Sequence, residues 1–520
     1  MAALWDEAKH SVLRRPSLCY AGRRMDHGTP LAAIDLGSNS FRLEIGRFDH
    51  GQIHRVEYLK ETVRLGGGLD ESRNLTTAAM QRGWDCLARF GERLAGFDKA
   101  HIRAVGTQTL REARNCDAFL SRAHEVLGCP IEVISGREEA RLIYQGVAHL
   151  LPQSDERRLV IDIGGRSTEL ILGQQFDARV TESYRVGSVA WSMRHFRDGE
   201  FTTAAFERAQ VAAQAVLDEA VGRYGRGHWD VAYGSSGTIG AVGDILSAGG
   251  HAAITREGLQ WLMQQLVAAR SADRVRLEGL KDDRRAVIGG GLAVLIALFD
   301  LLGIDVMQPA AGALRHGVLY DLLDREQATT DVRSATVQRL ATKFNVDTAQ
   351  ARRVGLVATR FLQQLRSGDD KPAVLARHER ELQWAATLHE IGSHISHADS
   401  HKHGAYILEN ADAAGFAQPE LHRLGLLVLG HRGKLRKLEA ELGEALFVHE
   451  LLCLRLAVIL CHARRDPDLS GLRLQPGPGP FRLAMRADWA RAYPQSAHLL
   501  REEVAAWQKT PRPLVVTISG

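Results

Sequence analysis

The stretch Leu159–Gly173 reads LVIDIGGRSTELILG, and the rest of the chain is best understood from it. Its first apolar residues surround the acid Asp162, and Gly164 and Gly165 separate them from a second apolar run, Leu170–Leu172. This pattern predicts two short buried strands joined by a glycine-bearing turn. The NH groups and hydroxyls of such a turn suit a phosphate, because glycine lets the backbone approach a ligand closely. Asp162, at the end of a buried strand, is placed to face a cation or a metal-bound water.

A second copy of this pattern occurs earlier in the chain, at Ala33–Gly46, AIDLGSNSFRLEIG. A shift of 127 residues, from Asp35 to Asp162, aligns the glycines and hydroxyl residues of the two stretches as well as their apolar residues. An internal repeat at domain spacing indicates two related domains. Two such loops, facing each other across a cleft, would grip a phosphate chain between two halves of the molecule.

Three further motifs occur in the chain: VGTQTLREARN at Val105–Asn115, EVISGREEARLIYQG at Glu132–Gly146 and YGSSGT at Tyr233–Thr238. Together with the two loops, they resemble the exopolyphosphatase and guanosine pentaphosphate phosphatase (Ppx/GppA) family, most closely its proteobacterial exopolyphosphatases. The resemblance covers residues 31 to 465. It implies an α/β fold with two actin-like (RNase H-like) domains around a cleft. An all-α HD-like domain and a small α+β C-terminal domain would follow them.

The predicted domain organisation has five parts: a tail at 1–30, actin-like domains at 31–153 and 154–325, the helical domain at 326–474, and a linker with the small domain at 475–520. Gln475–Pro480 is rich in proline and glycine, which is typical of a linker. We expect a helix at Ser496–Trp507, with Ser496 as its N-cap, between two strands. A unit of this size should pack on an earlier domain or on a partner subunit.

The predicted phosphate-binding residues follow strand ends, where ligands sit in open α/β sheets. Arg111 follows the buried strand Ile102–Gly106 and matches a family motif, and Arg315 lies in a further motif, GALRHG. The full set is Gly37, Ser38, Asn39, Ser40, Arg42, Arg111, Gly164, Gly165, Ser167, Thr168, Gly234, Ser235, Ser236, Gly237 and Arg315.

The acids are assigned through the resemblance. It implies that Glu139 is the catalytic base, and that Asp162 and Glu169 hold Mg²⁺ (or Mn²⁺), with K⁺ as an additional activator. The neighbouring Glu138 is interpreted as an acid favoured by the dipole at the start of a helix.

Two residues depart from the family's usual pattern. Arg166 stands at the third position of a loop that usually reads GGGST. It would be awkward there if the position needs a positive φ, or it would add a cation beside the phosphate. Arg42 stands where close relatives often carry histidine. Both changes make the predicted cleft more basic, which suits a polyanion.

The helical domain is dense in histidines: His389, His394, His397, His401, His403, His422 and His431. A metal-dependent HD phosphohydrolase centre needs an adjacent His-Asp pair, and this chain has His389 and Glu390 there. We therefore expect no active centre of that kind. The histidines are predicted to line a basic surface or channel with Lys402, Arg432, Lys434, Arg436 and Lys437, which would bind distal phosphates.

The composition alone does not indicate a polyanionic ligand, because the chain has 66 Lys and Arg residues against 62 Asp and Glu residues. Six cysteines without metal spacing indicate ordinary thiols in a reducing cytoplasm. No signal peptide and no transmembrane segment are expected, and peripheral association with the inner membrane stays open. No nucleic-acid partner is predicted, and the resemblance implies a homodimer.

The resemblance implies an exopolyphosphatase that removes terminal phosphate from inorganic polyphosphate, with Glu139 activating the attacking water. The nearest alternative is hydrolysis of the 5′-γ-phosphate of guanosine pentaphosphate (pppGpp) by the same residues, with ppGpp as a related ligand. The choice depends on whether the cleft ends in a base pocket or in a long basic tunnel. More distant alternatives are an ATP-dependent kinase and a non-catalytic alarmone-binding protein. Glu139 and the helical third domain argue against the kinase, and the presence of Glu139, Asp162 and Glu169 argues against a protein that only binds.

Overall fold

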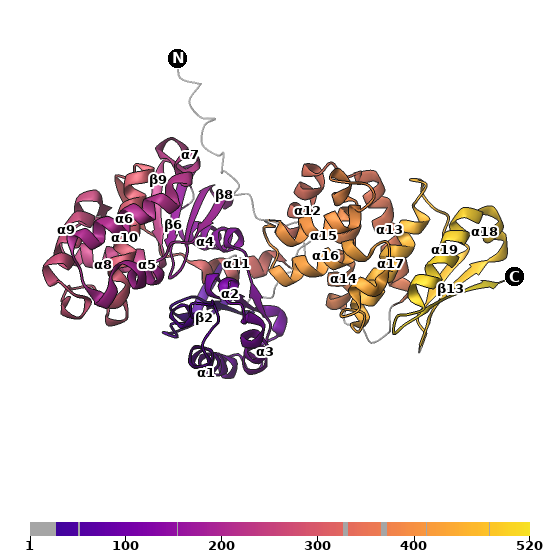
Figure 1. The fold of residues 1–520 in the computed structure, drawn as a ribbon, viewed down its shortest axis with the longest axis horizontal. Coiled ribbons are helices and arrows are strands. Elements are labelled where there is room, and N and C mark those ends of the chain that lie inside the picture. The colour runs from indigo at the N-terminus through magenta and orange to yellow at the C-terminus, as the bar shows by residue number, and fades with distance from the viewer. Residues whose placement is uncertain are drawn as a thin grey trace, which may run out of the picture.

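A computed structural model describes residues 28–519, apart from 50–51, 153, 326–330, 366–371, 412 and 478. Most of the predicted N-terminal tail therefore lies outside the described residues. Figure 1 shows two α/β lobes at one end of an elongated molecule, then a helical domain, then a small sheet with two helices at the C-terminal end. The predicted fold class is confirmed.

Lobe I is built on a five-stranded sheet in the order β3-β2-β1-β4-β5. The side chains of β1 alternate between two hydrophobic cores. Ala32 and Ile34 pack in the core under the helices of lobe I, whereas Leu31 and Ala33 pack in a core that includes residues of the second lobe. The elements are β1 (Pro30–Leu36), β2 (Phe41–Asp49), β3 (Gln52–Glu61), α1 (Thr77–Arg93), β4 (Ile102–Gly106), α2 (Gln108–Glu112), α3 (Cys116–Leu127), β5 (Ile131–Val133) and α4 (Gly136–Leu150).

Lobe II repeats this topology in a six-stranded sheet, β10-β11-β9-β6-β7-β8. The register repeats as well, because Asp35 lies opposite Arg42 in β1–β2 and Asp162 lies opposite Glu169 in β6–β7. The elements are β6 (Arg157–Ile163), β7 (Thr168–Gln174), β8 (Asp177–Tyr184), α5 (Ser188–His195), α6 (Thr203–Leu217), α7 (Val221–Tyr224), β9 (Val231–Ser235), α8 (Ser236–Ala248), β10 (Ile254–Thr255), α9 (Arg256–Ala269), α10 (Ile288–Leu302), β11 (Val306–Pro309) and α11 (Leu314–Arg325).

The apolar segment Asp282–Leu302, which includes α10, is long and apolar enough to cross a membrane by length and composition alone. Its most apolar window is 67% buried inside the structure. The residues of α10 form the centre of the lobe II core together with β6, β9 and α8. Burial inside this lobe accounts for the hydropathy of the segment.

Helices α4 and α11 pack together between the two sheets. Their backbones nearly touch, because a Cβ atom on Gly317 would lie 1.7 Å from the carbonyl oxygen of Leu142. Only glycine allows that approach. Although α11 falls within 154–325 of the sequence assignment, it packs on β1 of lobe I as well as on α4. The pair therefore joins the lobes through a shared apolar core.

The helical domain contains α12 (Val332–Lys343), α13 (Thr348–Gln364), α14 (Pro372–Leu388), α15 (Ser400–Asn410), α16 (Gln418–Gly430) and α17 (Ala445–Leu460). The prediction that its histidines line a surface is wrong for His389, His401 and His431, which are buried. Nδ1 of His389 and Nδ1 of His431 lie 2.7 Å and 2.6 Å from backbone carbonyl oxygens one helical turn earlier. These rings pack inside the domain, whereas Lys402, Arg432 and Lys434 are exposed.

The C-terminal unit is a three-stranded sheet of β12 (Leu472–Gln475), β13 (Phe481–Arg486) and β14 (Leu514–Ser519), with α18 (Ala487–Ala492) and α19 (Pro494–Trp507). It shares one apolar core with the helical domain. The start of its helix was predicted incorrectly, because α19 begins at Pro494 rather than after Ser496. Proline suits a first helical position, where no NH partner is needed.

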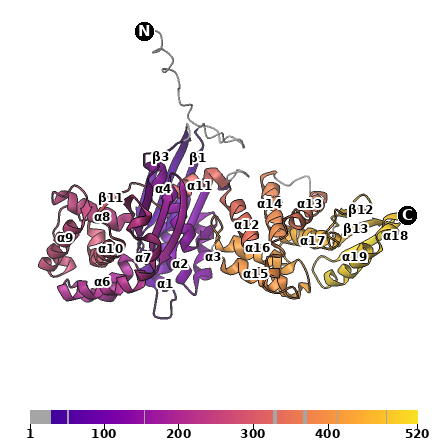
Figure 2. The same cartoon turned by 90° about the horizontal axis from the view of Figure 1, so that it is seen from above.

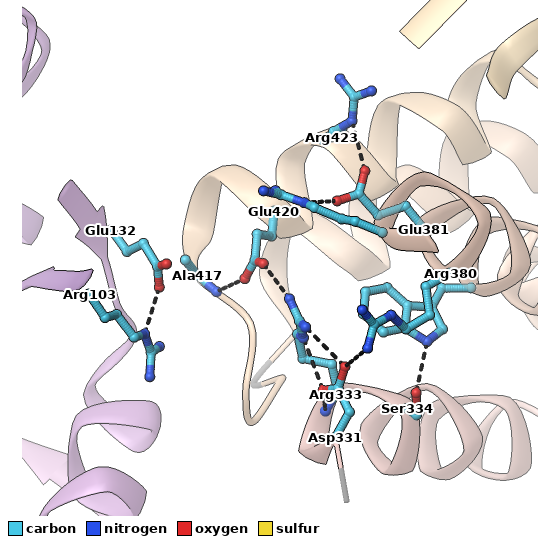
Figure 3. A network of polar contacts seen from close by, with 12 residues as sticks. Arg103, Glu132, Asp331, Arg333, Ser334, Arg380, Glu381, Ala417, Glu420 and Arg423 are labelled. Atoms are coloured by element: carbon cyan, nitrogen blue, oxygen red, sulfur yellow. Dashed lines mark hydrogen bonds and ion pairs between the residues drawn. The ribbon is translucent and has the colours of Figure 1, made fainter. Parts of the chain in front are cut away.

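The helical domain docks on lobe I beside the start of α4. The backbone NH of Gly415 donates to Oε2 of Glu138 at 2.7 Å, and Ala417 forms a β-bridge with Ile134. Figure 3 shows the charged pairs around this junction, with Arg103 and Glu132 of lobe I facing a group of pairs in the helical domain. From above, the two lobes and the helical domain form a row (Figure 2).

Replacing Gly317 with alanine should lower the free energy of unfolding by at least about 1–3 kcal/mol, because the new methyl group forces α4 and α11 apart. Gly222→Ala is the matched control, since nothing lies within 4 Å of its Cβ position. Thermal unfolding of both variants tests the contact. Equal stability of the two variants would contradict it.

Candidate active site in the cleft between the lobes

The two glycine-bearing turns face each other across the cleft. A Cβ on Gly165 would lie 3.0 Å from Cβ of Ser38 and 3.6 Å from the backbone nitrogen of Asn39. Neither Gly37, Gly164 nor Gly165 has a positive φ, so glycine serves close approach here and not a left-handed turn. The predicted juxtaposition of the two loops is present.

These loops line a cleft of about 390 Å³. Glu139 enters it from the first turn of α4, and Asp162 enters it from the end of β6. The predicted site residues that line it are Gly37, Ser38, Asn39, Ser40, Arg42, Glu139, Asp162, Gly164, Gly165, Ser167, Ser236, Gly237 and Arg315.

The other predicted residues lie behind the wall of the cleft or in the core. Thr168 is fully buried and its hydroxyl donates to the carbonyl oxygen of Val186 at 2.6 Å. Ser235 likewise donates to Gly312 at 2.9 Å, and Gly234 packs under Ile239. These side chains are engaged within the fold, and from this segment the next residues, Ser236, Gly237 and Thr238, line the cleft instead.

Ser236 has a φ of +84°, in the left-handed region that a non-glycine residue rarely adopts. It opens α8, and its hydroxyl oxygen accepts the backbone NH of Thr238 at 3.2 Å. Such strain persists only where surrounding contacts impose it, and it concentrates at ligand-binding sites.

The buried acids carry strongly perturbed protonation equilibria. Burial, together with the charge of Glu139, raises the pKa of Asp162 to about 7, although its contact with the Ser235 hydroxyl opposes the rise. Burial also raises the pKa of Glu169 well above its ordinary value, with further contributions from Glu139 and Asp162. For Glu139, burial raises the pKa and its ion pair with Arg111 opposes the rise.

The two repeats differ at the residue that lies opposite the strand acid. This difference determines which lobe brings more negative charge to the cleft. In lobe I, Arg42 donates to Asp35 at 2.9 Å, so this acid is neutralised within its own strand pair. In lobe II the position of Arg42 is taken by Glu169, which faces Asp162 across β6–β7. The second repeat therefore concentrates two carboxylates where the first forms an ion pair.

This donor set fits a divalent cation. Carboxylate oxygens are what Mg²⁺ prefers, and it commonly takes one or two carboxylates together with waters and substrate phosphates. Carboxylates whose pKa is raised by burial and mutual repulsion lack a countercharge that such an ion supplies. Asp162 would hold the metal from the cleft wall. Glu169 is only 1% exposed and accepts from Ser183 Oγ at 2.7 Å, so it stands deeper.

A second group of side chains, in the helical domain, has ligand atoms close enough together to hold a metal ion. Among the described residues, His378, Glu381 and Glu450 form the group of three whose ligand atoms all lie within 4.8 Å of one another. Arg423 donates to Glu450 at 2.8 Å and to Glu381 at 3.3 Å, and Arg377 donates to Glu381 at 2.8 Å. These arginines already supply the positive charge, so the cluster is an ion-pair network.

Three basic residues of the cleft were missed by the sequence analysis: Lys60, Lys281 and Arg284. Arg284 is only 9% exposed, and its nearest carboxylate oxygen belongs to Asp283 at 3.9 Å. Its guanidinium lies directly over Gly237, where a Cβ would come 2.2 Å from Nη2. None of the three lies in a quoted motif, so only the folded chain brings them to the cleft.

Arg315 lines the cleft as predicted, although its charge is already engaged. Its guanidinium is paired with Glu44 and lies 4.9 Å above the ring of Tyr58. Arg166 takes neither of the two roles considered for it, because its φ is not positive and it does not line the cleft.

Residues 45–326 match the Ppx/GppA phosphatase family, and residues 332–504 match domain III of that family. The chain belongs to the Ppx/GppA phosphatase family. A guanosine-5′-triphosphate,3′-diphosphate pyrophosphatase of Vibrio atlanticus is 40% identical over 480 residues, which cover 91% of this chain and 95% of the relative. The Vibrio cholerae protein of the same name is 41% identical over 441 residues, covering 84% and 88%. An exopolyphosphatase structure from Cytophaga hutchinsonii has a TM-score of 0.52 and 24% identity, covers 57% of this chain and 98% of its own, and shows the fold.

These Ppx/GppA relatives overturn the prediction of an exopolyphosphatase. At about 40% identity over most of both chains, they favour the alternative of a guanosine pentaphosphate phosphatase. The motifs quoted above predict phosphate binding and hydrolysis, which the two candidate substrates share, so they could not separate the two. The coarser prediction of a hydrolase acting on phosphoanhydride bonds is supported, which also disfavours the kinase and the non-catalytic sensor.

Removal of one buried charge from this Ppx/GppA protein should stabilise it. In its metal-free form Asp162 has a pKa of about 7, against 3.8 when unfolded, so stability falls as pH rises between those values. Asp162→Asn removes a penalty of up to about 4 kcal/mol at pH 8. Thermal unfolding should therefore show a higher Tm for the variant at pH 8 and little difference near pH 4.

Addition of Mg²⁺ at pH 8 gives the control for the same experiment. It should raise the Tm of the wild type and leave that of Asp162→Asn nearly unchanged. An equal rise in both proteins would contradict a metal-binding role for Asp162.

Proposed function

We propose that this protein hydrolyses the terminal phosphoanhydride bond of the 5′-triphosphate of guanosine pentaphosphate, releasing phosphate and leaving guanosine tetraphosphate. The observation that carries the proposal is the identity of about 40% to guanosine-5′-triphosphate,3′-diphosphate pyrophosphatases over most of both chains. The acids and phosphate loops of the cleft support the reaction type.

The outer part of the cleft supports a nucleotide rather than a bare phosphate chain. Tyr58 offers an aromatic ring at its rim, and Asp244 offers an exposed carboxylate that can accept the N1–H and N2–H groups of a guanine. Lys281 and Arg284 give positive charge in the same cleft for a second group of phosphates, and Lys60 also lines the cleft, in an ion pair with Asp283 at 2.6 Å. A 3′-diphosphate would complement these cations.

The residues of the cleft divide the work of hydrolysis. The backbone of the two glycine turns, with Ser38 and Ser167, would cradle the terminal phosphoryl group. Glu139 is held through Oε2 by Arg111 at 2.9 Å, which leaves Oε1 for a water in the cleft. It would take a proton from that water as the oxygen attacks phosphorus, in line with the bridging oxygen that leaves on the β-phosphate.

A divalent cation at Asp162 and Glu169, when bound, would supply positive charge to the phosphate oxygens. The raised pKa of Glu139 makes it a stronger base than an exposed glutamate, which suits proton abstraction near neutral pH. Mg²⁺ or Mn²⁺, K⁺, a homodimer and a cytoplasmic location stay predictions.

Glu139→Gln should lower kcat by about 10²–10⁴-fold while changing substrate binding little, because the amide keeps the shape and loses the base. Phosphate release from guanosine pentaphosphate measures kcat, and binding of guanosine tetraphosphate measures affinity. Equal losses in both would mean that Glu139 binds and does not catalyse.

Arg284→Ala should raise KM for guanosine pentaphosphate by about tenfold or more, since a guanidinium–phosphate contact contributes about 1.5–3 kcal/mol. GTP, which lacks the 3′-diphosphate, is the comparison substrate. If Arg284 binds the 3′-diphosphate, its removal leaves the KM for GTP nearly unchanged. A similar rise for both nucleotides would place Arg284 on the 5′-chain instead.

A further inference from the structure

Arg166 belongs to the glycine turn of lobe II, yet its side chain reaches lobe I. Its Nε and Nη2 donate to Oε2 of Glu112 at 2.9 Å and 2.7 Å, and its Nη1 donates to the carbonyl oxygen of Gly66 at 3.1 Å. Its neighbours Gly165 and Ser167 line the cleft, whereas Arg166 does not. The side chain therefore contacts the opposite lobe and not the ligand space.

The contact continues as a chain of hydrogen bonds to the candidate base. Oε1 of Glu112 accepts from Nε2 of Gln108 at 2.6 Å, and Oε1 of Gln108 accepts from Nη2 of Arg111 at 2.7 Å. Nη1 of Arg111 then donates to Oε2 of Glu139 at 2.9 Å. Each side chain in this series contacts the preceding residue through one polar atom and the next residue through another.

Arg111 is also anchored to the backbone, since its Nη1 donates to the carbonyl oxygen of Ile134 at 2.8 Å. A glutamate side chain on its own rotates broadly about its last torsion angle. Arg111 fixes one carboxylate oxygen of Glu139, and Gln108, which lies on the same helix α2, holds Arg111 by accepting from its guanidinium at 3.1 Å and 2.7 Å.

We propose that Arg166 is a positioning residue that locks α2 from the opposite lobe and so orients the Glu139 carboxylate toward the attacking water. The inference rests on the hydrolysis proposed above. Because Arg166 and Glu112 come from different lobes, the series of contacts also depends on how the two lobes are placed relative to each other.

The test measures kcat and KM separately for phosphate release from guanosine pentaphosphate. Arg166→Ala should lower kcat about 10–100-fold with less than a threefold change in KM, because a misplacement of about 1 Å costs up to 10²-fold in rate. Glu112→Ala should give the same loss, and the double variant should lose no more than either single variant. Arg166→Lys should restore part of kcat.

The matched control is Arg137→Ala. Arg137 of lobe I donates to Glu182 of lobe II at 2.9 Å, so it is a second arginine–glutamate pair between the lobes, outside the chain that ends at Glu139. Its removal should leave kcat unchanged. An equal loss in kcat for both variants, a rise in KM alone for Arg166→Ala, or multiplied losses in the double variant would overturn the proposal.

Thermal unfolding gives a readout that needs no activity. Arg166 and Glu139 are joined only through the chain, so independent effects on Tm would add. If the hydrogen-bond series couples the two residues, Arg166→Ala lowers Tm less in the Glu139→Gln background than in the wild type. Additive shifts in Tm would overturn the proposal. If the wild type releases no phosphate from guanosine pentaphosphate, the proposed function fails and the Tm coupling still decides the role of Arg166. Glu112→Gln replaces Arg166→Ala if the latter does not fold.

Discussion

The charge of Glu138 is fully buried, and three parts of the molecule meet around it. Arg141 donates to it at 2.8 Å, Arg103 of β4 lies 3.7 Å away, and the NH of Gly415 donates from the helical domain. Both arginines also pair with Asp321 on α11. Removing one partner from such a group strands a buried charge, at a cost of about 3–5 kcal/mol. The start of α4 is thereby fixed against lobe I, α11 and the helical domain at once.

Glu139 is the next residue, and its environment differs from that of Glu138 because consecutive helix positions point about 100° apart. Glu138 is compensated by several donors, whereas Glu139 has Arg111 and the repulsion of neighbouring acids. One acid stabilises the fold, and the other retains unfavourable energy that a bound cation would relieve. Adjacent positions of one helix therefore carry a structural acid and the proposed base.

The repeat and its register could be predicted from sequence, because the apolar pattern of each strand pair is local and strongly specified. Glu138 could not be interpreted in this way. Gly415, one of its donors, lies 277 residues away, so the sequence suggested only a dipole effect. Arg284 was missed for the same reason, since no motif contains it. Arg166 was noticed as unusual, but its partner Glu112 is 54 residues distant and the direction of the side chain was unpredictable.

The buried histidines of the helical domain cannot contribute charge to the basic surface or channel that was predicted there. Burial, together with the charges of Lys437 and Arg432, lowers the pKa of His401 to about 4. Burial also lowers the pKa of His431 well below its ordinary value, so both rings are neutral at physiological pH and add no positive charge to a channel. The cations that reach the ligand space instead lie inside the cleft, where Lys60 and Arg284 come from opposite lobes. Positive charge contributed by both lobes of one cleft suits the short, highly charged nucleotide proposed as the substrate.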